Sequence, residues 1–130
     1  MAGGQAIDIA AVGQTPGQQE LEAMHRLKTG ALIVASVEMG GLMGPAASQS
    51  TDGLRHLVAY AQNLGLAFQV VDDLLDASAD TQTLGKTAGK DQAQGKPTFV
   101  SLMGHERASD YAAQLLQQAL AELSGYGASA

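Results

Sequence analysis

The chain has no cysteine and no tryptophan, and its 130 residues include only two phenylalanines and three tyrosines. Without cysteine there is no disulfide and no thiol chemistry, which is compatible with a reducing compartment such as the cytoplasm. The sequence has no run of basic residues, and its formal net charge of -6 argues against nucleic acid or an anionic membrane as a partner. No apolar stretch reaches the roughly 18 residues of a membrane-spanning helix, and no signal peptide is visible. We therefore expect a cytoplasmic protein without stable membrane insertion.

Large core side chains are scarce as well. Hydrophobic residues make up 45% of the chain, but many of them are alanine. The alternation of β-branched residues that is typical of strands is absent. The composition predicts an all-α protein whose residues 1–130 form a single helical unit with a thin core. Such a unit needs a further part of the fold, or a second copy, to cover its apolar faces.

The apolar periodicity divides the chain into three helices and one connecting segment. The segment is rich in glycine, threonine, glutamine and aspartate and has no period, so we expect an ordered loop or lid. The expected helices cover residues 17–43, residues from Thr51 or Asp52 to about Ser78, and residues 97–123, with the loop at 79–96.

The segment from Gln69 to Asp76 carries three aspartates in the pattern D-D-x-x-D. At 100° per residue, Gln69, Asp72, Asp73 and Asp76 share one face of a helix. Carboxylates on one arc repel each other unless a cation is present, and Mg²⁺ typically binds one or two carboxylates together with waters and substrate phosphates. The segment therefore predicts a site for magnesium and a diphosphate.

An acidic cluster can also be an ordinary solvated surface, and the flanking residues decide between the two interpretations. Apolar side chains surround the acids, so we expect a largely buried helix whose acids face an internal cleft. These side chains are Leu64, Leu66, Phe68, Val70, Val71, Leu74 and Leu75.

Two other metal or phosphate motifs do not fit. An EF-hand loop that began at Asp72 would need a ligand at its third position, where Leu74 stands. A P-loop that ended in Gly85-Lys86-Thr87 would need a glycine at position 80, where Asp80 would repel the phosphates.

Lys28 lies on the apolar stripe of the first helix, beside Thr29 and Gly30. A lysine in this position can simply extend along the apolar surface to reach water. Gly30 in mid-helix costs up to about 1 kcal/mol relative to alanine, and the Thr29 hydroxyl can bend a helix by bonding a preceding carbonyl. We therefore expect local strain and a kink at this point. The three histidines, His25 among them, have no metal-ligand spacing and are interpreted as surface or packing residues.

Together these segments resemble the trans-polyprenyl diphosphate synthases, and most closely the bacterial short-chain enzymes of the farnesyl diphosphate synthase (geranyltranstransferase) type. The segment from Gln69 to Asp76 is similar to the second aspartate-rich motif of the family, and His25-Arg26-Leu27-Lys28-Thr29-Gly30-Ala31-Leu32 is similar to its K-T motif. The segment from Met1 to Asp8 resembles the G-Q-x-x-D sequence that precedes that motif. Gly85-Lys86, Asp91 and Gly95-Lys96 follow downstream in the order and spacing of the family.

This resemblance implies that the chain is the C-terminal half of the isoprenoid synthase helical bundle, and that the first aspartate-rich motif of the family lies upstream of Met1. It implies a transferase that uses Mg²⁺ to join an allylic diphosphate to isopentenyl diphosphate, giving farnesyl or a similar short-chain diphosphate. In that reaction an allylic cation forms as diphosphate departs, and the alkene of isopentenyl diphosphate attacks it. We expect a homodimer, and we expect the 130 residues alone to be inactive.

The resemblance also assigns roles to the matched polar residues. Asp72 is the direct metal ligand, while Asp73, Asp76 and Asp91 bind the metal through water or an intervening hydrogen bond. Lys28, Lys86 and Lys96 contact diphosphate oxygens, and Gln69 and Thr29 stabilise the cation through their oxygen dipoles. Gln5 and Asp8 match the family segment without a specific role.

Two alternatives remain open at this point. The chain could be a non-catalytic helical subunit that keeps the acidic face but lacks half of the active site. It could also belong to a terpene cyclase of the same fold, although such enzymes usually carry N-S-E metal motifs where this chain has aspartates followed by lysines. A separate chain with the first aspartate-rich motif would favour the first alternative.

Overall fold

The computed structural model describes residue 3 and residues 17–44, 50–83 and 96–129, without the side chains of residues 80–83 and 127–129. Within these ranges every regular element is helical, so the predicted all-α fold is confirmed. In chain order the elements are α2 (Gln18–His25), the π-helical turn η1 (Arg26–Gly30), α3 (Ala31–Met43), α5 (Thr51–Thr83), α7 (Phe99–Met103), α8 (His105–Glu122) and the 3₁₀ turn η2 (Ser124–Ser129).

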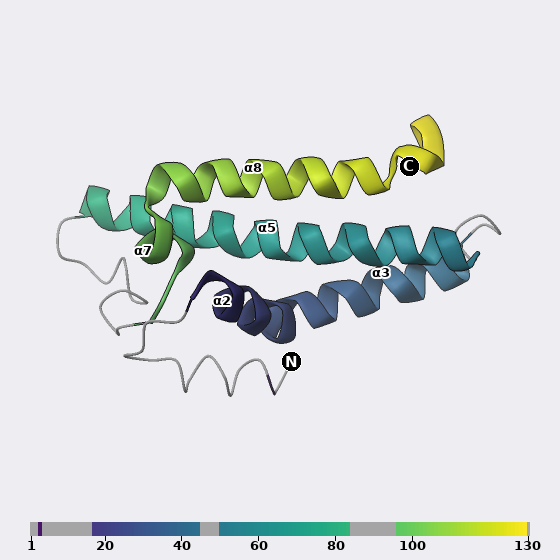
Figure 1. The fold of residues 1–130 in the computed structure, drawn as a ribbon, viewed down its shortest axis with the longest axis horizontal. Coiled ribbons are helices and arrows are strands. Elements are labelled where there is room, and N and C mark those ends of the chain that lie inside the picture. Colours follow the sequence, from purple (N-terminus) through teal and green to yellow (C-terminus); the bar gives the residue numbers. More distant parts are fainter. Residues whose placement is uncertain (1–2, 4–16, 45–49, 84–95, 130) are drawn as a thin grey trace.

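The long helix α5 is the central element, with α8 along one side and the α2, η1 and α3 run along another (Figure 1). Alanines of α8 face α5 and allow the two helices to pack closely, while α2 and α7 close one end of this interface. The resulting core cluster consists of Leu21, Met24, Leu66, Ala67, Val70, Phe99, Ala108, Ala112 and Leu115.

The first predicted helix is confirmed as an unbroken helical run from Gln18 to Met43. The carboxylate of Glu20 accepts a hydrogen bond of 3.0 Å from the backbone N–H of Gly17, which satisfies a donor that the start of a helix leaves open. The run ends where Gly44 turns into an extended conformation. The kink expected near Gly30 corresponds to η1, where the helix widens into a π turn.

Two predicted boundaries are wrong. Helix α5 continues to Thr83, so residues 79–83 of the predicted loop are helical. Ser78 does not end the helix, because its hydroxyl bonds the carbonyl of Leu74 at 2.8 Å within the helix. The predicted third helix is broken at Gly104, whose φ of 85° is the left-handed conformation that glycine tolerates best. The break turns α7 away from the axis of α8.

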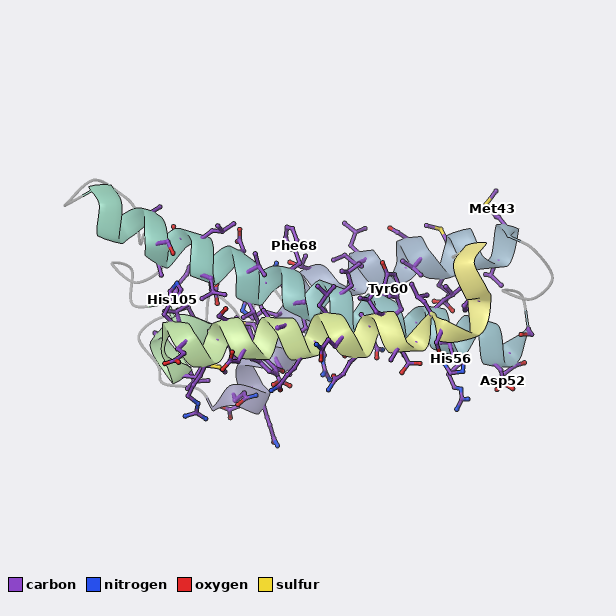
Figure 2. All side chains as sticks on the ribbon, turned by 90° about the horizontal axis from the view of Figure 1, so that it is seen from above. Met43, Asp52, His56, Tyr60, Phe68 and His105 are labelled. Atoms are coloured by element: carbon purple, nitrogen blue, oxygen red, sulfur yellow. The ribbon has the colours of Figure 1, made fainter. Side chains whose placement is uncertain are left out.

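The expectation that the acidic helix is largely buried is also wrong for the described residues. Phe68, Val71 and Leu75 on α5 are 59, 43 and 65% exposed, and Phe68 points away from the bundle (Figure 2). The reason is that other helices cover α5 on some sides only. Helix α3 likewise exposes apolar side chains, at Leu32, Met39, Leu42 and Met43. Among the described residues no helix is long and apolar enough to cross a membrane.

Candidate functional site

One face of α5 carries Gln69, Asp72 and Asp76, as the helical spacing predicts. Gln69 is buried, Asp76 is half-buried and Asp72 is exposed. Within the described part of the chain, none of these three side chains has a hydrogen bond or an ion pair. Their oxygen atoms therefore remain available to a cation or a ligand.

Asp73 follows Asp72 directly but has a different environment. Its Oδ2 accepts a hydrogen bond of 2.8 Å from the backbone N–H of Phe99, the first residue of α7. The sequence grouped Asp73 with the other acids of the face and gave no indication of this partner, which lies 26 residues further along the chain. The adjacent residues Asp72 and Asp73 thus differ in environment: Asp73 bonds the backbone of α7, whereas Asp72 is exposed.

The K-T segment packs directly against α5 at a pair of glycines. A Cβ atom added to Gly65 would lie 3.4 Å from Cα of Gly30 and 3.3 Å from Cδ1 of Ile33. The π turn η1, with half-buried Lys28 and Thr29, therefore lies against α5 one helical turn before Gln69. Such single π turns are frequent at functional sites. The structure thus brings the K-T segment to the helix that carries the aspartates.

Of the two physical reasons expected for the kink, the bond from the Thr29 hydroxyl is not observed. Within the described residues the Thr29 hydroxyl makes no hydrogen bond to a preceding carbonyl. The hydroxyls of Ser36 and Ser78 make such bonds elsewhere, at 2.8 Å each, and their helices continue undisturbed. The close approach of Gly30 to Gly65 is the feature that accompanies the π turn, and it needs a small residue at position 65 of α5.

Phe99 connects the aspartate helix with the K-T segment. Its side chain is completely buried, and its ring stacks on that of His25 with centroids 5.4 Å apart. His25 is the last residue of α2 and directly precedes η1. The interpretation of His25 as a packing residue is therefore confirmed, whereas the contribution of Phe99 was not foreseen.

The remaining predicted site residues divide by whether they are described. Lys96 is half-buried and lies three residues before Phe99, at the point where the described chain resumes after position 95. The other predicted contributors, together with most of the expected lid at 79–96, fall outside the described residues. These contributors are Gln5, Asp8, Lys86 and Asp91.

The donor set on α5 suits Mg²⁺ better than a metal that the protein alone would enclose. No three histidine or acidic side chains of the described ranges converge on one point. Asp72 and Asp76 are one helical turn apart and have no ionic partner among the residues that the structure describes. This matches the one or two carboxylates that Mg²⁺ takes when waters and phosphates complete its shell. Gln69 can add an amide oxygen beside them.

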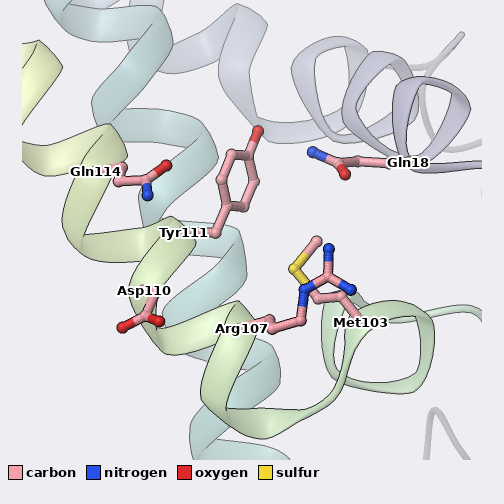
Figure 3. Close-up of a pocket in the computed structure, with 6 residues that line it drawn as sticks. All are labelled: Gln18, Met103, Arg107, Asp110, Tyr111 and Gln114. Carbon is pink, nitrogen blue, oxygen red and sulfur yellow. The ribbon is translucent and has the colours of Figure 1, made fainter.

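A separate hollow of about 240 Å³ lies between α2, α7 and α8 and contains none of the predicted site residues (Figure 3). Tyr111 lies across it and donates a hydrogen bond of 2.6 Å to the carboxylate of Glu22. Burial, reinforced by that carboxylate, raises the pKa of Tyr111 to about 12. The bond joins α8 to α2, and we interpret it as structural. The residues around the hollow are Gln18, Met103, Arg107, Asp110, Tyr111 and Gln114.

Another hollow, of about 400 Å³, lies at the opposite end of α5. There His56 Nδ1 lies 2.6 Å from an oxygen of Glu122, and the Tyr126 hydroxyl donates to the carbonyl of Gly53 at 2.6 Å. These contacts join the start of α5 to the end of α8. The residues in these two contacts are separated by 66 and 73 positions in the sequence, so no local sequence pattern predicts the contacts.

Comparison with known proteins gives a consistent result. The family model for polyprenyl synthetase matches residues 1–125. Over 120 residues the chain is 50% identical to a protein of Sinorhizobium fredii named probable farnesyl diphosphate synthase, and over 119 residues it is 47% identical to the farnesyl diphosphate synthase of Escherichia coli. These matches cover 91 and 92% of this chain but only 36 and 39% of the relatives, so the chain spans a little over a third of their length.

A solved structure shows the same arrangement of helices. The geranyltransferase of Helicobacter pylori complexed with magnesium and isoprenyl diphosphate superimposes with a TM-score of 0.75 at 36% identity. The match covers 96% of this chain and 40% of that protein.

Proposed function

The chain belongs to the polyprenyl synthetase family, and on that premise we propose that the protein containing it condenses an allylic diphosphate with isopentenyl diphosphate. The product in this proposal is farnesyl diphosphate or a similar short-chain prenyl diphosphate. The observation that carries the proposal is a pair of carboxylates, Asp72 and Asp76, on the helix against which the K-T turn packs; neither has a partner among the described residues. The relatives named farnesyl diphosphate synthase support it.

In this proposal the acidic face binds the diphosphate of the allylic substrate through magnesium. When bound, Mg²⁺ supplies positive charge that stabilises the departing diphosphate. Asp72 is the direct ligand, and Asp76 holds water in the metal shell. The Helicobacter pylori neighbour, which was solved with magnesium and isoprenyl diphosphate, supports the use of this metal with a diphosphate.

The remaining residues act on the two ends of the bond that breaks. Lys28 and Lys96 contact diphosphate oxygens, as does Lys86, which lies outside the described residues. Asp91, also outside them, binds the metal through water. Gln69 is buried on the face of α5, so its amide oxygen can stabilise the allylic cation without competition from bulk water. Thr29, in the π turn, contributes a second oxygen dipole.

Phe68, Val71 and Leu75 form an exposed apolar surface on α5. We include in the proposal that the remaining part of the synthase fold covers it, and that the complete protein is a homodimer. In this proposal the part of the fold that covers the surface also forms the second wall of the active site, so the 130 residues alone form only one wall.

The test is a condensation assay of the complete protein with geranyl diphosphate, isopentenyl diphosphate and Mg²⁺, with products identified by mass spectrometry. We expect farnesyl diphosphate or a near homologue, and loss of turnover when the metal is chelated. The 130-residue chain alone should give no product. A complete protein that binds the diphosphates but forms no carbon–carbon bond would support the non-catalytic subunit instead.

A further inference from the structure

We propose that Asp73 is a positioning residue and not a metal ligand. Its carboxylate holds the backbone of Phe99, and through Phe99 it fixes both the K-T turn and the segment that begins at Lys96. This inference rests on the proposed function for its effect on turnover, but its structural part stands independently.

The carboxylates of Asp72 and Asp73 are adjacent in sequence but differ in environment. Asp72 is exposed and has no partner within the described residues, whereas Asp73 is half-buried and accepts the Phe99 N–H at 2.8 Å. A hydrogen bond from a backbone N–H to an ionised carboxylate is about twice as strong as one between neutral groups. An oxygen engaged in this way is a poorer metal ligand than one that is free.

The second step is that Phe99 needs this bond. The first N–H groups of a helix have no acceptor within the helix. In α7 the Thr98 hydroxyl accepts from the N–H of Ser101 at 3.0 Å, and Asp73 accepts from that of Phe99. The Ser101 hydroxyl in turn accepts from the N–H of Thr98 at 2.9 Å. Three side chains thus fix the start of this five-residue helix, two from the segment itself and one from α5.

The third step connects this start to the K-T turn. The buried Phe99 ring stacks on His25, which directly precedes η1 with Lys28 and Thr29. On the other side of Phe99, the chain leads back through Pro97 to Lys96 within three residues. A shift of Phe99 would therefore displace two lysines that the proposed function assigns to the diphosphate.

A pair of substitutions separates positioning from metal binding. Asp73→Asn keeps a side-chain oxygen that can accept the Phe99 N–H, while Asp73→Ala removes it. For a positioning residue, Asp73→Asn should leave the KM for the allylic diphosphate within about 3-fold of the wild type, and Asp73→Ala should raise it about 10-fold or more. Neither should shift the Mg²⁺ concentration for half-maximal rate by more than about 3-fold.

The matched controls are Asp72→Asn and Asp72→Ala. Since an amide is a weak ligand for Mg²⁺, both should raise the half-maximal Mg²⁺ concentration by about 10-fold or more. If Asp73→Asn raises the Mg²⁺ requirement as strongly as Asp72→Asn, Asp73 is a metal ligand and the proposal is wrong.

A second readout does not depend on turnover. The ring protons of His25 experience the ring current of Phe99, so their NMR chemical shifts report the stack. In the complete protein these shifts should change in Asp73→Ala and be retained in Asp73→Asn and Asp72→Ala. Unchanged shifts in Asp73→Ala would overturn the positioning role even if the enzyme is active. Changed shifts in a protein without prenyl transfer would uphold it and refute only the proposed function.

Discussion

Helix α5 has two apolar faces of similar composition and opposite environment. Leu66 and Val70 face the core and are 2 and 0% exposed, whereas Phe68 and Leu75 on another face are 59 and 65% exposed. The first face is completed by α8, α7 and α2 of the same chain. The second face has the side chains of a core but no covering helix among the described residues. An apolar face in the sequence therefore does not show that the helices of the same chain cover it.

The polar residues lie between these faces. At 100° per residue the order around α5 runs from Leu66 through Asp73, Gln69 and Asp72 to Phe68. Asp73, next to the covered face, is held by Phe99, and Asp72, next to the bare face, has no partner in the described part of the chain. The acids thus lie along the edge where the folded chain meets whatever completes the site. This position agrees with a role in binding a ligand between two halves.

The largest expected effect comes from two identical substitutions on the two faces. Leu66→Ala should lower the free energy of unfolding of the chain by about 2–5 kcal/mol, because it leaves a cavity in the core. Leu75→Ala in the same chain should change it by less than about 0.5 kcal/mol. Urea unfolding followed by circular dichroism measures both. Equal losses would show that the bare face is already covered, for instance by self-association.

The stability cost of Leu75→Ala should depend on whether the rest of the protein is present. If the rest of the synthase covers the second face, Leu75→Ala should cost about 2–5 kcal/mol in the complete protein, as Leu66→Ala does in the chain. The same unfolding measurement on both forms decides this. A cost that stays below about 0.5 kcal/mol in the complete protein would place the covering surface elsewhere.

A smaller effect concerns the contact between α5 and the K-T turn. Gly65→Ala should lower the free energy of unfolding by about 1–3 kcal/mol, since its Cβ would meet Ile33 at 3.3 Å and Gly30 at 3.4 Å. Gly30→Ala is the matched control, because its nearest contacts would be ordinary ones of 3.6 and 3.8 Å. That change should be neutral or stabilising by up to about 1 kcal/mol. The reverse order of the two effects would contradict this packing.

The smallest effect concerns the covered side, at Tyr111. Tyr111→Phe should cost about 1 kcal/mol at neutral pH, because it removes the hydrogen bond to Glu22. Burial and Glu22 raise the pKa of Tyr111 to about 12, above its ordinary value of 10. The contribution of the protonated phenol is therefore complete below pH about 10 and is lost as the pH rises toward 12. The stability difference between wild type and variant should narrow over that range and not at lower pH.

The sequence predicts much of this molecule because the decisive patterns are local. The 3.6-residue period places Gln69, Asp72 and Asp76 on one face, and the glycine at position 30 indicates an irregular helix at η1. The end of α5 was misplaced because residues after Ser78 include no proline or glycine that would stop a helix before Gly85. The break at Gly104 was missed because an isolated glycine is tolerated in a helix and gives only a weak signal.

The features of the site that the sequence does not predict are contacts between residues far apart in the chain. The bond from Phe99 to Asp73 and the stack of Phe99 on His25 arise only when α7 packs against α5 and α2. One weak signal was present, because Phe99 is one of only two phenylalanines and follows Thr98, a good helix N-cap. The exposure of Phe68 and Leu75 could not be predicted either, since periodicity identifies an apolar face but not its neighbour.

In the proposed function, Asp72 is the metal ligand of a prenyl transfer site on the edge between the two faces of α5. The most direct test is the kcat of the complete protein with Asp72→Ala, compared with Asp110→Ala, an exposed aspartate on α8 that has no partner in the described chain. We expect Asp72→Ala to lower kcat by about 10³-fold, or roughly 4 kcal/mol, with a smaller change in KM, because charge stabilisation grows as the diphosphate departs. Asp110→Ala should change kcat by less than about 2-fold. A kcat for Asp72→Ala equal to that of Asp110→Ala would contradict the claim and make Asp72 an ordinary surface charge.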